Sequence, residues 1–372
     1  MKDTVIKLLL RTIVWGLVVA AGATVVLIIA RLIQRNPVYF FQQVVNGLQL
    51  GFVYALIALG YTMIYGVVKL INFAHGDVFM VGSFVSFYAI TRYRLHLLPA
   101  GIYYRSQGIT PTPEVLEQAP AWTMVVGTVL VILLAMAACG FLNIIIERVA
   151  YKPLRNAPRI AALITAIGVS FFLEYFTALG FVFGPDYYTY IRPMPVTAWN
   201  IGGVAISNIL LVIIISTIFL LVLLQYIVTR TKIGKAMRAS AFDKPTARLM
   251  GINVDMVISF TFALGAIFAG AAGVLYAIAY PQIITFVGIR PGLKAFVAAV
   301  LGGIGNIPGA FVGSLIMGQA EAMTIGFFSV TMPSGEVLAG STLRDAIVFA
   351  ILILVFLIRP TGIFGEPEGE KA

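Results

Sequence analysis

Residues 47–83 read GLQLGFVYALIALGYTMIYGVVKLINFAHGDVFMVGS, and this stretch decides the fold. It begins as an apolar run that can cross a membrane, is interrupted at Asn72, His75, Gly76 and Asp77, and then becomes apolar again. Polar, flexible backbone at the end of an apolar span is costly in lipid, so it persists where it is buried in protein or lines a watery path. The pattern is typical of a protein that moves a solute.

The composition outside this stretch indicates a polytopic membrane protein. Of 372 residues, 60% are hydrophobic and 11% are charged, whereas soluble domains are roughly half apolar and one quarter charged. The net charge is +10, and the basic residues cluster in short loops between apolar runs. This is the pattern of cytoplasmic loops beside membrane lipid, and it argues against nucleic-acid binding.

The apolar runs predict an all-α polytopic membrane protein with nine or ten transmembrane segments, some of them broken or re-entrant. A span needs about 20 mostly apolar residues. The candidates are 12–33, 43–66, 75–92, 122–146, 160–183, 204–229, 255–279, 293–303, 309–328 and 343–359. The run at 293–303 is too short to cross alone. We read 12–33 as a retained helix, although Ala21-Gly22-Ala23 resembles a signal-peptidase site.

The most basic loops, 147–159 and 230–248, are predicted to lie in the cytoplasm. The N-terminus and the tail at 367–372 then lie inside as well. This topology closes only if 293–328 dips inward and returns, with its turn at the glycines that include Gly302, Gly303 and Gly305.

Each half of the chain therefore contains one interruption, and paired broken helices are the best sequence indication of a transport site. We predict that Asn72, His75, Gly76, Asp77, Gly302, Gly303 and Gly305 line a translocation path or gate. In this topology His75 and Asp77 lie near the inner membrane face. The structural alternative to a gate is that Asp77 favours a helix N-terminus and His75 bonds backbone that Gly76 leaves free.

Residues 230–253 predict a short amphipathic helix, ended by Asp243 and Pro245, with Asn253 capping the next span and Asp255 in its first turn. Lys232, Lys235 and Arg238 form its basic stripe. Such a helix suits docking of a soluble partner, and it equally suits a basic helix resting on anionic headgroups.

The sequence contains no catalytic constellation. It has two histidines, no cluster with metal-ligand spacing and no G-x-x-x-x-G-K-[ST] phosphate loop, so we expect no enzyme activity, cofactor or metal. Transport would be driven by another subunit or by an ion gradient. Glu174 and Glu321 are the mid-span carboxylates that an ion-coupled carrier would use, although a static polar role fits both.

The chain closely resembles the branched-chain amino acid ABC transporter permeases of the LivH type. The resemblance covers about residues 40–366 and rests on these stretches: Asn46–Ser83, Glu147–Arg155 (ERVAYKPLR), Thr229–Asn253 with GKAMRA at 234–239, Gly292–Phe296, Ala298–Gly309 and Arg359–Gly362. Residues 1–36 add a transmembrane helix to the usual family start, residues 37–366 form the permease domain, and Leu97–Pro120 is a long insertion. Glu174 stands where we expect a neutral polar residue.

The resemblance implies an ABC importer permease fold in the bacterial inner membrane. It implies a second homologous permease, two ATP-binding subunits and a periplasmic substrate-binding protein as partners. It also implies that Gly234, Lys235, Ala236, Met237, Arg238 and Ala239 couple the permease to the ATPases.

The implied cargo is leucine, isoleucine or valine, although relatives carry urea, amides or aromatic amino acids. The competing hypotheses are a stand-alone carrier or channel that depends on Glu174 or Glu321, and a membrane scaffold, against which the two broken spans argue.

Overall fold

The computed structural model describes residues 30–155, 157–331 and 337–365. Within these ranges, the helical stretches long and apolar enough to cross a membrane are α2 (Pro37–Val68), α6 with its continuation (Ala121–Leu154), α7 (Arg159–Thr177), α8 (Asn208–Arg230), α11 (Val254–Ala279), α13 (Ile307–Phe327) and α14 (Gly340–Ile358). Two shorter helices, α3 (His75–Thr91) and α12 (Ile289–Gly302), belong to the same bundle. The all-α polytopic fold is thereby confirmed. The predicted span at 12–33 lies almost entirely outside the described residues, as does the tail at 367–372.

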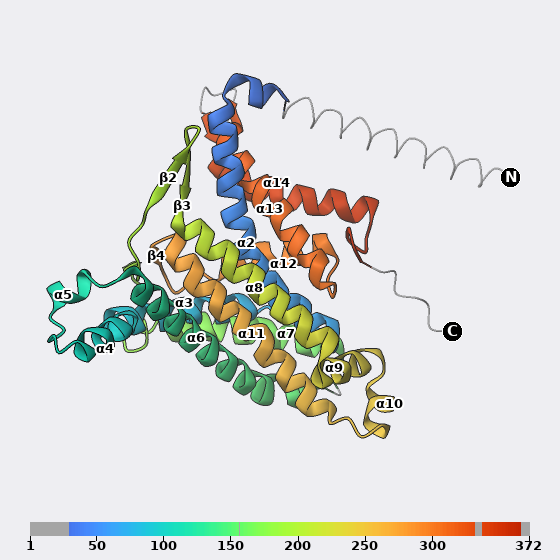
Figure 1. Ribbon diagram of the computed structural model, residues 1–372. Helices are drawn as coiled ribbons and strands as arrows, with labels where there is room; N and C mark the ends of the chain where they lie inside the picture. Colours follow the sequence, from blue (N-terminus) through green and yellow to red (C-terminus); the bar gives the residue numbers. More distant parts are fainter. Residues whose placement is uncertain (1–29, 156, 332–336, 366–372) are drawn as a thin grey trace.

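The centre of the bundle is formed by α2 and α11, most of whose residues are buried, whereas α8 and α14 are largely exposed. Figure 1 shows α6, α11 and α8 running side by side across α2. Close packing is possible because α11 is rich in small residues: a Cβ on Gly270 would lie 2.7 Å from the Ala135 carbonyl oxygen.

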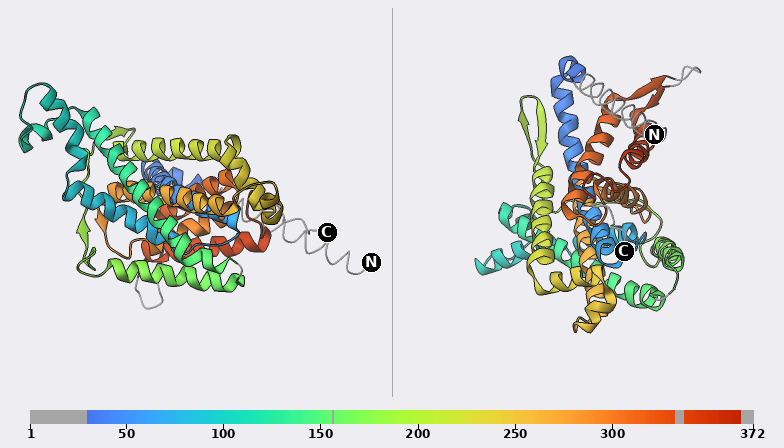
Figure 2. Two further views of the ribbon diagram at one scale, coloured as in Figure 1. Left: turned by 90° about the horizontal axis from the view of Figure 1, so that it is seen from below. Right: turned by 90° about the vertical axis from the view of Figure 1, so that its right-hand side faces the viewer.

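The two ends of the bundle differ. One end, which we call the basic end, carries α9 (Lys232–Phe242), α10 (Lys244–Leu249) and the π-helical and 3-10 turns η2 (Glu147–Tyr151) and η3 (Lys152–Leu154) that prolong α6. The long insertion forms η1 (Leu95–Leu97), α4 (Leu98–Ser106) and α5 (Pro113–Glu117), and Figure 2 shows it projecting away from α9 and α10.

Short antiparallel strand pairs complete the described chain. They are β1 (Tyr188–Thr189) with β4 (Gln282–Ile283), β2 (Ala198–Ile201) with β3 (Val204–Ser207), and β5 (Ser329–Thr331) with β6 (Val337–Ala339). The predicted spans at 160–183 and 204–229 are shorter in the structure, because α7 ends at Thr177 and β3 precedes α8.

The first interruption differs from its predicted position. After α2 ends at Val68, Lys69 takes a left-handed conformation (φ 61°) and the chain turns back along the helix. The His75 ring then packs where a Cβ on Gly60 would lie, 2.2 Å from its Nε2. Gly60 is eight residues before the end of α2, or about 12 Å along its axis. His75 and Asp77 therefore lie well inside the bundle rather than at its inner face.

The second interruption is the predicted turn. It joins α12 to α13 at Gly303 and Gly305, which have positive φ values of 105° and 98°, a region that glycine occupies without strain. Asn306 then caps α13 by accepting a hydrogen bond from the Gly309 N–H at 2.9 Å. The segment after α14 returns to this turn, where the N–H of Phe364 donates to the Gly302 carbonyl at 3.0 Å. Residues 293–328 thus dip towards the basic end and return, as predicted.

Candidate coupling and translocation site

The hairpin of α9 and α10 at the basic end is bounded as the sequence predicts. Thr231 caps α9 by accepting from the Gly234 N–H at 3.1 Å, and Asp243 caps α10 by accepting from the Thr246 N–H at 3.3 Å. Asn253 caps α11 and Asp255 lies in its first turn. Local side-chain caps therefore fix the hairpin between two spans.

One face of α9 is fastened to the end of α8. Gly234, Met237 and Ser240 are buried, and a Cβ on Gly234 would lie 2.2 Å from the Ile227 carbonyl oxygen. The guanidinium of Arg238 donates to the Val228 carbonyl, one of the last carbonyls of α8, which a helix leaves without intrahelical partners. Gly234, Met237 and Arg238 therefore hold α9 in place, independently of the predicted coupling role.

The other face of the hairpin is open. Lys235 is exposed, and Ala236 and Ala239 are half-buried. Three large apolar side chains project beside them, with exposures of 82% for Phe242, 87% for Leu249 and 78% for Met250. We call Lys235, Phe242, Leu249 and Met250 the docking surface. Exposed apolar patches with charged neighbours at a helix end mark sites of contact with a protein or a membrane surface.

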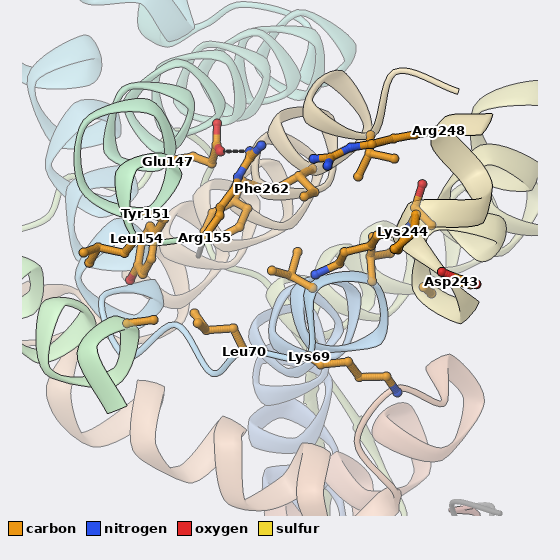
Figure 3. A pocket seen from close by; sticks show the side chains of 18 of the residues that line it. Lys69, Leu70, Glu147, Tyr151, Leu154, Arg155, Asp243, Lys244, Arg248 and Phe262 are labelled. Atoms are coloured by element: carbon orange, nitrogen blue, oxygen red, sulfur yellow. Dashed lines mark hydrogen bonds and ion pairs between the residues drawn. The ribbon is translucent and has the colours of Figure 1, made fainter. Parts of the chain in front are cut away.

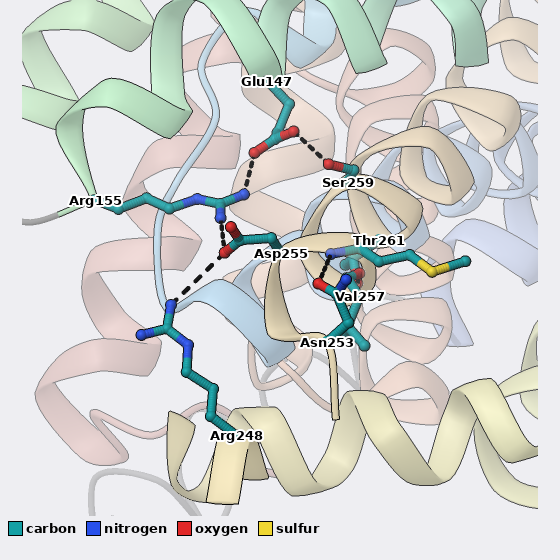
Figure 4. A network of polar contacts seen from close by, with 9 residues as sticks. Glu147, Arg155, Arg248, Asn253, Asp255, Val257, Ser259 and Thr261 are labelled. Carbon is teal, nitrogen blue, oxygen red and sulfur yellow. Dashed lines mark hydrogen bonds and ion pairs between the residues drawn. The ribbon is translucent and has the colours of Figure 1, made fainter. Parts of the chain in front are cut away.

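A charged network lies between this hairpin and the rest of the basic end (Figure 4). The guanidinium of Arg155 pairs with Glu147 and with Asp255, and Arg248 of α10 lies 3.6 Å from Asp255. Ser259 of α11 donates to the second oxygen of Glu147 at 2.6 Å. We call these five residues the end network. It explains why the ERVAYKPLR stretch begins with a glutamate and ends with an arginine.

A cavity of about 460 Å³ lies between the end network and the hairpin. Its walls come from the end of α2, from η2 and η3, and from α9, α10 and α11, and Figure 3 shows Lys69, Lys244 and Arg248 on its sides. Cationic side chains and Asp243 share its lining with apolar residues. The docking surface thus stands beside a hollow rather than over solid core.

The predicted gate residues around the first interruption differ in their contacts. Asn72 accepts a hydrogen bond of 2.6 Å from the Tyr151 hydroxyl. Neither ring nitrogen of His75 has a well-aligned partner among the described residues, although the Ile57 carbonyl lies near. The bond that His75 was expected to make to backbone beside Gly76 is therefore absent. Gly76 permits a close crossing instead, because its Cβ would lie 2.7 Å from the Gly288 carbonyl oxygen.

Asp77 is in the first turn of α3, as predicted, and it faces a small cavity of about 130 Å³ between α3, α7 and α12. Ser170 of α7 donates to its carboxylate at 2.5 Å, and Glu174 interacts with the same group across the cavity. Gly288 and Gly292 lie beside this cavity at the start of α12, and Gly302 lies at the end of the same helix. Helix α12 therefore links the two interruptions.

The second predicted mid-span carboxylate also has partners. Glu321 of α13 accepts from Lys294 of α12 at 2.7 Å and from Tyr54 of α2 at 2.9 Å. None of the residues that bind Glu321 is predicted from the sequence as a site residue. The available signal was the presence of Lys294, Arg344 and Asp345 inside apolar stretches, where a charge has a functional or structural reason.

A multi-pass helical bundle with broken spans, a capped hairpin at its basic end and polar cavities between its helices is the architecture of a membrane transport protein. The family model described as "Branched-chain amino acid transport system / permease component" matches residues 43–356. The chain belongs to this family.

Three relatives are similar over nearly their whole length. The high-affinity branched-chain amino acid transport system permease proteins LivH of Escherichia coli (strain K12) and of Salmonella typhimurium are each 40% identical over 342 residues, which is 90% of this chain and 98% of each relative. The corresponding protein BraD of Pseudomonas aeruginosa is 38% identical over 348 residues, with the same coverage. A solved complex, PsaBC from Streptococcus pneumoniae with Fab, aligns with a TM-score of 0.37 at 12% identity, covering 90% of this chain and 97% of that one.

Proposed function

We propose that this chain is a permease subunit of an ATP-driven importer for branched-chain amino acids in the bacterial inner membrane. It forms the translocation path with a second, homologous permease, and it works with two ATP-binding subunits and a periplasmic binding protein. The cargo is supported by the names of the LivH and BraD relatives. The basic end faces the cytoplasm, in accordance with its arginines and lysines.

The observation that carries the proposal is the docking surface. A hairpin that is capped at both helices, fastened on one face and apolar on the other presents a firm, shallow surface to a soluble subunit. Closure of the ATP-binding subunits would push this hairpin towards the cavity at the basic end and shift the helices that line that cavity. The cavity at Asp77 lies beside the start of α12, and the turn that contains Gly302, Gly303 and Gly305 lies at its end, so a tilt of α12 would open or close the path.

The first experiment is a mild-detergent purification of the tagged chain from its own membrane, with partners identified by mass spectrometry. We expect two ATP-binding subunits and a second permease. Leu249→Glu should abolish recovery of the ATP-binding subunits and reduce ATP-driven leucine uptake at least about tenfold, because a carboxylate would be buried in the contact. The matched control is Tyr93→Glu, a residue of similar exposure (78%) after α3 and away from the hairpin.

The outcomes separate the alternatives. If the ATP-binding subunits are recovered with Leu249→Glu and uptake is normal, the docking surface is wrong. If the chain is recovered alone in several detergents and carries amino acids without ATP, it is a self-contained carrier. In that case Glu174 and Asp77 are the residues to change next, since they face each other inside the bundle.

A further inference from the structure

A second group of charged residues lies far from the end network. Lys294 of α12 places its Nζ 2.7 Å from Glu321 of α13 and 2.7 Å from Asp345 of α14. Arg344 lies 3.6 Å from both carboxylates, and Tyr54 of α2 donates to Glu321 at 2.9 Å. We call these five residues the charge cluster. Its members come from helices that are distant in the sequence, so the fold brings them together.

The charge cluster lies within the thickness of the membrane. Tyr54 is fourteen residues before the end of α2 at the basic end, or about 21 Å along the helix axis. The hydrocarbon core of a bilayer is about 30 Å thick. Charged side chains at this depth almost always face protein, water or another subunit rather than lipid.

The charge cluster is buried on one side and open on the other. Lys294 and Glu321 are 5% and 2% exposed, but Arg344 is 31% and Asp345 is 42% exposed. Both of the open residues belong to α14, which is the least buried of the long helices in the described chain. Exposing Arg344 and Asp345 to lipid would be costly, so the start of α14 must border water or the partner permease.

The charges of the cluster are complementary to an α-amino acid. Lys294 and Arg344 balance Glu321 and Asp345, so the cluster is neutral, and a zwitterion can enter it without adding net charge. An ammonium group can replace a base beside Asp345, and a carboxylate can replace an acid beside Arg344.

On the basis of the function proposed above, we propose that the charge cluster binds the α-ammonium and α-carboxylate groups of the amino acid within the membrane. Asp345 receives the ammonium group and Arg344 receives the carboxylate, while the buried Lys294 and Glu321 hold these two open residues in place. The aliphatic side chain then needs only an apolar wall. The cluster recognises the part that all α-amino acids share, so selection among side chains falls to the binding protein.

The first test measures whether water reaches Asp345. Cysteine labelling is suitable because the chain has a single cysteine, Cys139, which is buried. In a Cys139→Ala background, Asp345→Cys and Ile215→Cys are compared in membrane vesicles that contain the assembled complex. Ile215 of α8 is a control with 67% exposure and an apolar setting. We expect a charged, water-soluble methanethiosulfonate to label Asp345→Cys about tenfold faster, because thiolate reacts only where water reaches it. Equal labelling rates would overturn the proposal.

Coupling is the second test. Asp345→Asn should reduce leucine uptake per ATP hydrolysed about tenfold, because a neutral amide cannot pair with an ammonium group. Asp345→Glu should restore most of the ratio. A merely structural role would lower assembly and ATP hydrolysis together with uptake, which leaves the ratio unchanged and contradicts the proposal.

The two proposals fail in distinguishable ways. If the wild-type complex shows no ATP-dependent uptake of leucine, the proposed function is wrong. If wild-type uptake is ATP-dependent while Asp345→Asn keeps its normal ratio, only the charge cluster is assigned wrongly.

Discussion

The end network and the charge cluster contain the same chemistry in different surroundings. Each joins two carboxylates to two basic side chains and one hydroxyl. In the end network, Arg248 and Asp255 are 62% and 47% exposed at a helix end, where water can solvate them. In the charge cluster, Lys294 and Glu321 are buried at membrane depth. The contrast teaches that water can stand in for a lost partner at a solvated helix end, whereas a charge buried at membrane depth depends on the partner that it has.

The largest expected effect is in the charge cluster. Glu321→Leu leaves Lys294 and Arg344 with one carboxylate between them, and removing one partner of a buried pair costs about 3–5 kcal/mol. The double variant Lys294→Met/Glu321→Leu should recover much of this stability, since Arg344 and Asp345 still pair. The measurement is the thermal unfolding midpoint of the purified complex. If Glu321→Leu is as stable as the double variant, the buried charges of the cluster do not depend on their partners, and the contrast with the end network is wrong.

The next effect concerns the turn at the other end of α12, the helix that carries Lys294. A Cβ on Gly302 would lie 1.9 Å from the Gly309 carbonyl oxygen, and backbone cannot yield as a side chain can. We expect Gly302→Ala to destabilise the protein by about 3 kcal/mol, as overpacking does. Gly168→Ala on α7 is the control, because nothing lies within 4 Å of its Cβ position. Similar unfolding midpoints would show that the turn adapts.

Within the end network, Arg155→Ala should have a smaller effect than Glu321→Leu. It removes the cation from the buried Glu147, but Ser259 still donates to that carboxylate and water can approach from the cavity. We expect a loss of about 2 kcal/mol. The double variant Arg155→Ala/Glu147→Gln should be more stable than the single variant Arg155→Ala. An effect as large as that of Glu321→Leu would mean that the two regions do not differ in hydration.

The sequence predicts the helical elements of both regions but not their contacts. Apolar runs, caps and the glycines near 302–305 are local signals, so the spans, the α9–α10 hairpin and the turn before α13 could be placed. Two features depend on long-range packing: the return of residues 69–74 along α2, and the contacts among Lys294, Glu321 and Asp345. The periodicity of a single sequence carries no information about such contacts. For this reason the local pattern predicts His75 at the membrane face and gives no indication of the contacts of Lys294.

The smallest expected effect is that of Arg248→Ala. Arg248 is 62% exposed and lies 3.6 Å from an Asp255 that Arg155 already neutralises. Exposed pairs of this kind contribute about 0–1 kcal/mol, so the unfolding midpoint of the isolated chain should hardly change, at low or high salt. Arg248 also stands directly before Leu249 and Met250 of the docking surface. If the ATP-binding subunits present acidic groups there, their recovery with Arg248→Ala should be lower than that of the wild type at low salt and should depend less on salt. A clear loss of stability in the isolated chain would instead place Arg248 among the residues that hold the fold, and would remove the distinction between a solvated end network and a buried charge cluster.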